Sequence, residues 1–185
     1  MLTIITPCCR QANIPKLYDS IMFDKIHQWI IIYDTTRGRR YDKIYDNDPK
    51  IMEVECADAG CSGNSQRNYG LKLAADGFIY FLDDDNIIHP EFWNLADNFD
   101  PAYFYTFNQL RKKNGELLNG NNIALCRIDT AMFVVHKKHI GEIVWRLNEY
   151  TADGYFICDV SAAPANKGKH RFLNVVACYY NFLAT

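Results

Sequence analysis

Short runs of apolar residues recur along the first half of the chain, and they predict buried strands. The runs Leu2–Thr6, Trp29–Tyr33, Ile51–Cys56 and Phe78–Leu82 are rich in β-branched and aromatic residues. Continuous apolar runs of this length are typical of strands covered on both faces. Segments with apolar residues at helical spacing, 13–22 and 65–75, lie between them. This order favours a parallel sheet with right-handed crossovers.

The second half of the chain has a different pattern, with more aromatic residues and an Asn-Gly turn. Its apolar periodicity predicts a short helix at 92–99, a hairpin of Ala102–Phe107 with Glu116–Leu118 around Lys112–Gly115, strands at 123–125, 131–135 and 171–178, and helices at 136–147 and 152–163. The sequence has no internal repeat, low-complexity tract or linker. We therefore expect one α/β domain over residues 1–185, with a Rossmann-like mixed β-sheet flanked by helices.

Composition and charge exclude several classes of protein. The 185 residues are 49% hydrophobic and 14% aromatic with a net charge of −2, which excludes disorder and does not favour a nucleic-acid partner. The cluster Arg37, Arg39 and Arg40 is typical of a solvated loop. No run approaches the roughly 20 apolar residues of a membrane span, and the start lacks a basic signal-peptide region. Seven cysteines without a CxxC pair indicate reduced thiols, so we expect a cytoplasmic protein without a zinc site.

Three consecutive carboxylates, Asp83, Asp84 and Asp85, follow the Phe78–Leu82 run. Ligands of open α/β sheets bind beyond the carboxyl ends of the strands, so we expect these acids to lie at a site. Adjacent anions raise one another's pKa unless a cation joins them. Oxygen ligands suit Mn²⁺ or Mg²⁺. The alternative is an acidic turn before the helix that Pro90 begins.

A second acid, Asp34, ends the Trp29–Tyr33 run and could accept a hydrogen bond from a ribose hydroxyl or a base N–H, although Asp is also a common turn residue. The sequence has neither a dinucleotide fingerprint nor a phosphate-binding P-loop. Phosphate binding would then depend on a metal and on basic side chains, for which Arg67, His170 and Arg171 are candidates. His170 is equally compatible with an ordinary surface histidine.

Four segments together resemble the GT-A fold glycosyltransferases. They are Ile5-Thr-Pro7, Gln28–Asp34, Gln66-Arg-Asn68 and Ile79–Asn86, the last ending in Asp-Asp-Asp-Asn. The pattern is most similar to the inverting glucuronosyltransferases of proteoglycan synthesis, and more loosely to the large bacterial glycosyltransferase family. The resemblance covers the first two-thirds of the chain well and the remainder thinly. It implies a nucleotide-binding half, residues 1–86, and an acceptor-binding half, residues 87–185.

The resemblance implies an enzyme that transfers a sugar with inversion from a nucleoside-diphosphate sugar, with a UDP-sugar favoured, to a glycan or other hydroxyl acceptor. Asp85 would be the principal ligand of Mn²⁺ or Mg²⁺, with Asp83 beside it. Residues implied in donor binding are Thr6, Pro7, Arg10, Asp34, Arg67, Asp83, Asp84, His170 and Arg171. The chain departs from the family before Gln66, where Cys61–Asn64 replaces an expected arginine.

The resemblance also implies which acids act on the acceptor. Inverting members of the fold place an acid at the start of a helix in the second half, which favours Asp153 as the general base; its alternative is a helix cap. Asp159 is the second candidate for the base. Asp129 lies in a segment that resembles the part of the family contacting the acceptor sugar, and would position the acceptor.

Two other functions remain open from the sequence. A sugar-phosphate nucleotidyltransferase has a similar half-sheet, but it needs a glycine-rich, arginine-bearing loop after the first strand, where this chain has Pro7–Gln11. A non-catalytic nucleotide- or carbohydrate-binding module of the same fold is the third hypothesis. Hydrolysis of a donor sugar would distinguish an enzyme from a binding module.

Overall fold

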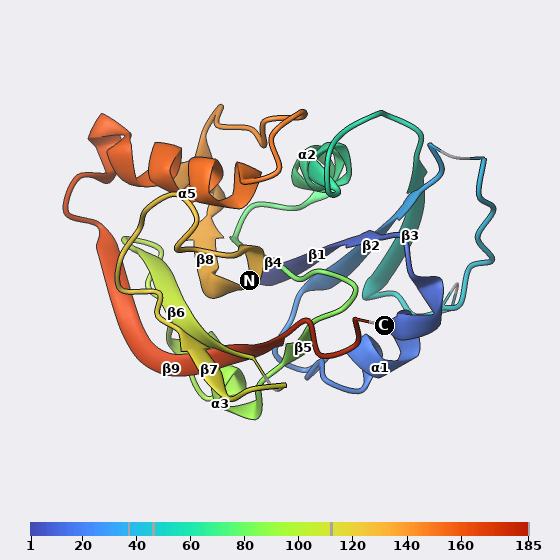
Figure 1. Ribbon diagram of the computed structural model, residues 1–185, viewed down its shortest axis with the longest axis horizontal. Coiled ribbons are helices and arrows are strands. Elements are labelled where there is room, and N and C mark those ends of the chain that lie inside the picture. The colour runs from blue at the N-terminus through green and yellow to red at the C-terminus, as the bar shows by residue number, and fades with distance from the viewer. Residues whose placement is uncertain (37, 46, 112, 185) are drawn as a thin grey trace.

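The computed structural model describes residues 1–36, 38–45, 47–111 and 113–184, which form a curled mixed sheet with helices on both faces (Figure 1). Arg37 of the predicted basic loop and Lys112 of the predicted turn lie outside these residues. Along the described chain the strands run in the order β3-β2-β1-β4-β8-β6-β9-β5, and β7 pairs with β6. No described helix combines the length and apolar character that crossing a membrane requires.

The first half contains the predicted parallel strands β1 (Leu2–Cys8), β2 (Gln28–Asp34), β3 (Ile51–Cys56) and β4 (Phe78–Phe81). Strand β1 continues through Pro7, where the sequence predicts its end. The β1–β4 pairing stops at Ile5, so Pro7 pairs with β2 alone. A proline is tolerated at such a one-sided position because a strand there needs fewer N–H donors.

Helices α1 (Ile14–Tyr18) and α2 (Asn64–Leu73) cover opposite faces of this parallel half (Figure 1). Helix α1 ends four residues earlier than predicted, and the Ser20 hydroxyl donates to the Leu17 carbonyl just beyond it. Such side-chain bonds compete with helix continuation. Helix α2 packs closely because a Cβ at Gly70 would stand 2.5 Å from the Ile5 side chain.

The second half extends the sheet with antiparallel and parallel pairs. Its elements are β5 (Ile87–Ile88), α3 (Pro90–Trp93), β6 (Phe104–Arg111), β7 (Glu116–Leu118), β8 (Phe133–His136), α4 (Lys137–Ile140), α5 (Ala152–Ala162) and β9 (His170–Tyr180). Strand β8 is antiparallel to β4 and β6, whereas β9 runs parallel to β6. The β6–β7 hairpin and helix α5 are confirmed.

Four predictions for this half are wrong in whole or in their bounds. Residues 123–125 are irregular rather than a strand, and the next residue, Cys126, has a φ of 60°. The strand expected from Ala131 begins at Phe133, because a short turn of helix over Thr130–Met132 comes first. The helix expected over 136–147 stops at Ile140, since Gly141 adopts a φ of +55° that ends it. The helix expected over 92–99 is two short pieces, α3 and Ala96–Asn98.

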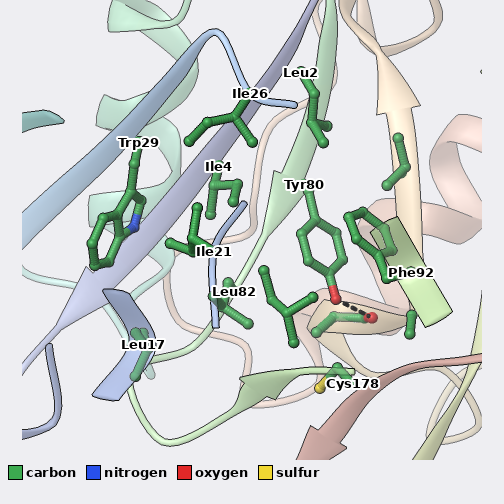
Figure 2. Close-up of a cluster of buried hydrophobic side chains, with 14 of the residues drawn as sticks. Leu2, Ile4, Leu17, Ile21, Ile26, Trp29, Tyr80, Leu82, Phe92 and Cys178 are labelled. Atoms are coloured by element: carbon green, nitrogen blue, oxygen red, sulfur yellow. Dashed lines mark hydrogen bonds between the residues drawn. The ribbon is translucent and has the colours of Figure 1, made fainter. Parts of the chain in front are cut away.

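Two clusters of buried side chains hold the sheet from its two sides. On the side of α1 and α3, Tyr80 stacks on Phe92 and donates its hydroxyl hydrogen to the Ala131 carbonyl (Figure 2). On the other side, Phe81 packs edge-on against Trp145 and Phe156. Strand β4 is thus covered on both faces, as predicted, and it gives the three carboxylates after it a rigid base.

Candidate active site

A cavity of about 730 Å³ opens at the carboxyl ends of β1, β2 and β4. This volume is in the range of small-molecule sites. From the first half it is lined by Pro7, Cys8, Cys9, Arg10, Asp34, Thr36, Gly60, Ser62–Asn64, Gln66, Arg67 and Asp83–Asp85. From the second half it is lined by Arg111, Leu118, Cys126–Thr130, Trp145, Tyr150, Thr151, Asp153, Tyr180 and Asn181. Both halves of the chain therefore contribute to one site.

The middle carboxylate of the triplet, Asp84, is bound to the loop after β1. Its Oδ2 accepts hydrogen bonds from the backbone N–H groups of Cys9 and Arg10, at 2.7 Å each, and its Oδ1 accepts one from the Arg10 Nε at 2.8 Å. Asp84 is only 2% exposed. A buried carboxylate is stable when donors satisfy its oxygens, so Asp84 fixes the loop, and its oxygens at the cavity wall are already occupied.

The outer carboxylates pair with two different arginines. Asp83 forms an ion pair with Arg67, and Asp85 lies 2.8 Å from the Arg10 guanidinium. Burial, followed by the charges of Asp83 and Asp84, raises the pKa of Asp85 to about 6, although Arg10 acts to lower it. The carboxylate of Asp85 is therefore incompletely compensated in this arrangement.

The outer carboxylates fit a divalent cation that is shared with a ligand. Among the described residues, no three His, Cys, Asp or Glu side chains converge as in a metal site made by protein alone. Magnesium-type cations are commonly held by one or two carboxylates together with substrate phosphates. Asp85 and Asp83 supply hard oxygen atoms of that kind at the cavity wall. Manganese accepts the same ligands.

Arg67 is fixed at the start of α2 by contacts on several sides. It donates to the Ser62 carbonyl and the Asn64 side chain, pairs with Asp83, and lies 4.6 Å above the centre of the Trp145 ring. The turn before α2 needs a glycine, because Gly63 has a φ of +81° and its Cβ would meet Pro7 at 2.7 Å. Arg67 is 4% exposed, so it is a preorganised cation in the wall of the cavity.

Two further acids, Asp129 and Asp153, line the cavity from the second half. Burial raises the pKa of Asp129 to about 7, and the charges of Asp83 and Asp153 act in the same direction. Burial also raises the pKa of Asp153, which accepts the Gly154 N–H at 2.7 Å. Both acids interact electrostatically with Arg67 and Asp83. A group of acids with raised pKa values in one cleft is typical of a site of proton transfer.

Solved structures share this arrangement of elements. S. aureus TarS 1–349 in complex with UDP matches with a TM-score of 0.72 and 15% identity, over 96% of this chain and 59% of that one. Its complex with UDP-GlcNAc matches with a TM-score of 0.65 and 16% identity, over 96% and 57%. Glucosyl-3-phosphoglycerate synthase of Mycobacterium tuberculosis, with Mn²⁺, UDP and phosphoglyceric acid, matches with a TM-score of 0.61 and 11% identity, over 96% and 69%.

The chain has the GT-A fold. This confirms the fold class predicted from the sequence and, at the level of the fold, the resemblance to the GT-A glycosyltransferases. The closer similarity to the inverting glucuronosyltransferases stays a prediction. No family model matches the sequence, and no curated protein matches it. At 11–16% identity the solved structures show the fold alone. The chain spans 59% of the length of TarS 1–349 in its complex with UDP and 57% of its length in the complex with UDP-GlcNAc.

Within the GT-A fold, the structure brings nine of the predicted site residues to the cavity: Pro7, Arg10, Asp34, Arg67, Asp83, Asp84, Asp85, Asp129 and Asp153. Thr6 is placed elsewhere. Its side chain is buried and accepts a hydrogen bond from the Trp29 Nε1 at 2.9 Å. Asp159 pairs with Arg146 on an exposed face of α5. Six residues separate it from Asp153, or about 240° around a helix, so the two face different ways.

His170 and Arg171 also lie outside the cavity of the GT-A fold. They begin strand β9 and pair with Phe104 and Tyr105, whereas the other end of the same strand, Tyr180, reaches the cavity. The His170 ring bonds to the Thr106 hydroxyl at 2.8 Å, and Arg171 stacks on the Tyr103 ring. The direction of β9 separates both residues from the carboxylates, so we do not include them in the proposed site.

Tyr180 and Asn181 also line the cavity, although no sequence pattern pointed to them. They reach the cavity because the end of the described chain is bound to the acid loop: the Asn181 N–H donates to Asn86 at 2.7 Å, and the Leu183 N–H to the Asp85 carbonyl at 2.8 Å. Asn86 is fully buried. The position of Asn86 directly after the three carboxylates can be read from the sequence. Its bond to Asn181 cannot, because that residue lies 95 positions away.

Proposed function

We propose that the chain is a metal-dependent glycosyltransferase, which moves a sugar from a nucleoside-diphosphate sugar to a hydroxyl group of a glycan or other acceptor with inversion. A UDP-sugar is the favoured donor. The observation that carries this proposal is one cavity that receives cations and carboxylates for a donor from the first half of the chain and two half-buried acids, Asp129 and Asp153, from the second. Complexes of TarS with UDP and UDP-GlcNAc support the choice of donor.

The nucleoside would bind at the end of β2. The Asp34 Oδ1 already accepts from the Thr36 N–H at 3.0 Å and from the Thr36 hydroxyl at 2.7 Å, which fixes the orientation of the carboxylate. Its second oxygen remains an acceptor for a ribose hydroxyl or a base N–H. Arg67 and Arg10, on the same side of the cavity, would face the diphosphate.

Asp85 and Asp83 would hold Mn²⁺ or Mg²⁺, which would stabilise the negative charge that develops on the departing diphosphate. The complex of glucosyl-3-phosphoglycerate synthase with Mn²⁺ and UDP supports this assignment. Arg67 would act on the same charge, because Trp145 and Asn64 hold it in place before the donor arrives. Preorganised cations of this kind need no rearrangement during the reaction.

The transfer would be one direct displacement. The acceptor oxygen forms a bond to the anomeric carbon while the bond from that carbon to the diphosphate oxygen breaks, and the electron pair leaves with the diphosphate. The acceptor proton passes to Asp153, whose pKa is raised by burial and which is therefore a stronger base. Asp129 would accept a hydrogen bond from the acceptor and position it. A single displacement inverts the anomeric centre.

A thermal-shift panel tests the donor assignment. UDP, GDP, ADP and CDP are each added with Mn²⁺ or with a chelator, and the melting temperature is measured. We expect UDP with Mn²⁺ to give the largest increase, since a ligand at about 100 times its Kd stabilises the folded state by roughly 2.7 kcal/mol. Absence of a shift with every diphosphate would contradict the proposal, and a larger shift with another base would correct the favoured donor.

A further inference from the structure

Arg10 bridges two of the three carboxylates. Its Nη2 lies 2.5 Å from Asp84 Oδ1 and 2.8 Å from Asp85 Oδ2, and its Nε lies 2.8 Å from Asp84 Oδ1. A positive group therefore already stands at one of the two Asp85 oxygens available to a cation. A divalent ion bound to the same Asp85 oxygen would lie about 2.0–2.6 Å from it. The guanidinium and the ion would compete for the same oxygen and repel each other.

The surroundings allow the Arg10 side chain to leave without loss of the loop. Its side chain is 42% exposed, in contrast to the 4% of Arg67. Asp84 keeps the two backbone N–H bonds from Cys9 and Arg10 whatever the guanidinium does. The Asp85 backbone is held separately by the Leu183 N–H. The carboxylates are thus fixed, and the arginine side chain is the movable part.

We propose that Arg10 is an internal counter-ion that occupies the cation position beside Asp85 in the free protein, so that a divalent metal enters together with the donor diphosphate. This inference rests on the proposed function. The metal alone must displace the guanidinium from Asp85 and leaves it without an anion. When a diphosphate arrives with the metal, the released guanidinium gains phosphate oxygens, for which its planar fork of donors is well suited.

The arrangement predicts coupling between the two ligands. The metal should bind weakly to the free protein and much more tightly in the presence of UDP, and UDP should gain the same factor from the metal. Part of this coupling comes from direct contact of phosphate with metal. The remainder comes from Arg10 and should disappear when its side chain is removed.

Calorimetric titration of Mn²⁺, without nucleotide, tests the role of Arg10 directly. We compare the parent with Arg10→Ala and Arg10→Gln, and use Arg171→Ala as the control because it removes a positive charge outside the cavity. Both variants lack the guanidinium that competes with the metal for Asp85. Mn²⁺ should therefore bind at least about tenfold more tightly to them than to the parent. Arg171→Ala should bind Mn²⁺ as the parent does. In Arg10→Ala/Asp85→Asn the gain should vanish.

A second titration, of Mn²⁺ in the presence of saturating UDP, measures the coupling. The factor by which UDP tightens Mn²⁺ binding should shrink in Arg10→Ala by about the gain seen without UDP. Equal or weaker binding of Mn²⁺ alone by both folded Arg10 variants would overturn the inference. Failure of the parent to bind UDP at saturating Mn²⁺ would instead contradict the proposed function, while the titration without nucleotide still decides the role of Arg10.

Discussion

The carboxylate of Asp84 accepts the backbone N–H of Arg10 at 2.7 Å and also pairs with the guanidinium of the same residue. This contact joins the end of β4 to the loop after β1, across 74 positions of the chain. It gives the three adjacent acids different functions. Asp84 organises the loop, whereas Asp83 and Asp85 remain available to the cavity.

Replacement of Asp84 should therefore affect stability first. In Asp84→Ala, two backbone N–H groups and the guanidinium lose their acceptor, so we expect the free energy of unfolding to fall by about 1.5–3 kcal/mol. Urea unfolding measures this loss. Asp85→Ala is the matched control and should lose less, because burial already disfavours its charged form. Equal losses in the two variants would contradict the separate role of Asp84.

Replacement of Asp85 should affect metal-dependent binding. We expect UDP to bind Asp85→Ala weakly with or without Mn²⁺, whereas the parent should bind UDP more tightly when Mn²⁺ is present. Asp83→Asn should be milder, because an amide oxygen still accepts a hydrogen bond. Titration calorimetry with and without a chelator gives these affinities. If the parent bound UDP equally well in both conditions, the metal assignment would be wrong.

Asp34 should contribute to the binding of the nucleoside and not to the binding of the diphosphate. We expect Asp34→Ala to weaken UDP binding by about 1.5–3 kcal/mol, the range for a hydrogen bond to a charged group. Binding of inorganic pyrophosphate with Mn²⁺ should stay as in the parent. Arg67→Ala is the contrasting variant and should weaken both ligands. If Asp34→Ala bound UDP as tightly as the parent, the nucleoside would not bind at this end of β2.

Asp129 should make stability depend on pH. Its pKa is about 7 in the folded chain and about 3.9 in an unfolded one. The folded state thus holds an extra proton between these values, and its contribution to stability is lost as the pH rises from about 4 through 7. Asp129→Asn removes this loss. We expect it to raise the melting temperature at pH 8 more than at pH 5, by roughly 2–4 °C for each kcal/mol regained.

Asp159→Asn is the control for this measurement, because it changes an acid of α5 in an exposed pair with Arg146. Exposed pairs contribute only about 0–1 kcal/mol, so its melting temperature should stay near that of the parent. An Asp129→Asn protein with the same difference from the parent at both pH values would show that Asp129 does not titrate in this range.

The parallel half of the fold could be predicted because its signals are local. The runs of β1, β2 and β4 became buried strands, the run Ile51–Cys56 became the partly exposed edge strand β3, and parallel strands place their carboxyl ends at one edge. This brought Asp34 and the acids after Phe81 together. The role of Asp84 was not predictable, since its donors lie in the Cys9–Arg10 backbone and no local pattern records that contact.

The second half was harder because direction and turn geometry decide it. Apolar spacing predicted a helix through Trp145, but Gly141 ends that helix and Trp145 packs against Phe156 from a loop. His170 and Arg171 were predicted near phosphates. Strand β9 runs parallel to β6, so its first residues lie at the opposite end from Tyr180. Strand direction follows from the tertiary structure and not from hydrophobic periodicity.

The most direct test of the central claim is release of UDP from a panel of UDP-sugars, with water as the acceptor, by the parent and by Asp153→Asn. We predict release that requires Mn²⁺ in the parent, and a rate roughly 10²–10⁴-fold lower in Asp153→Asn, the typical loss of a general base. UDP affinity should be equal in the two proteins. UDP bound tightly but released from no donor in the panel would contradict the claim and indicate a binding module, and an unchanged rate in Asp153→Asn would place the base elsewhere.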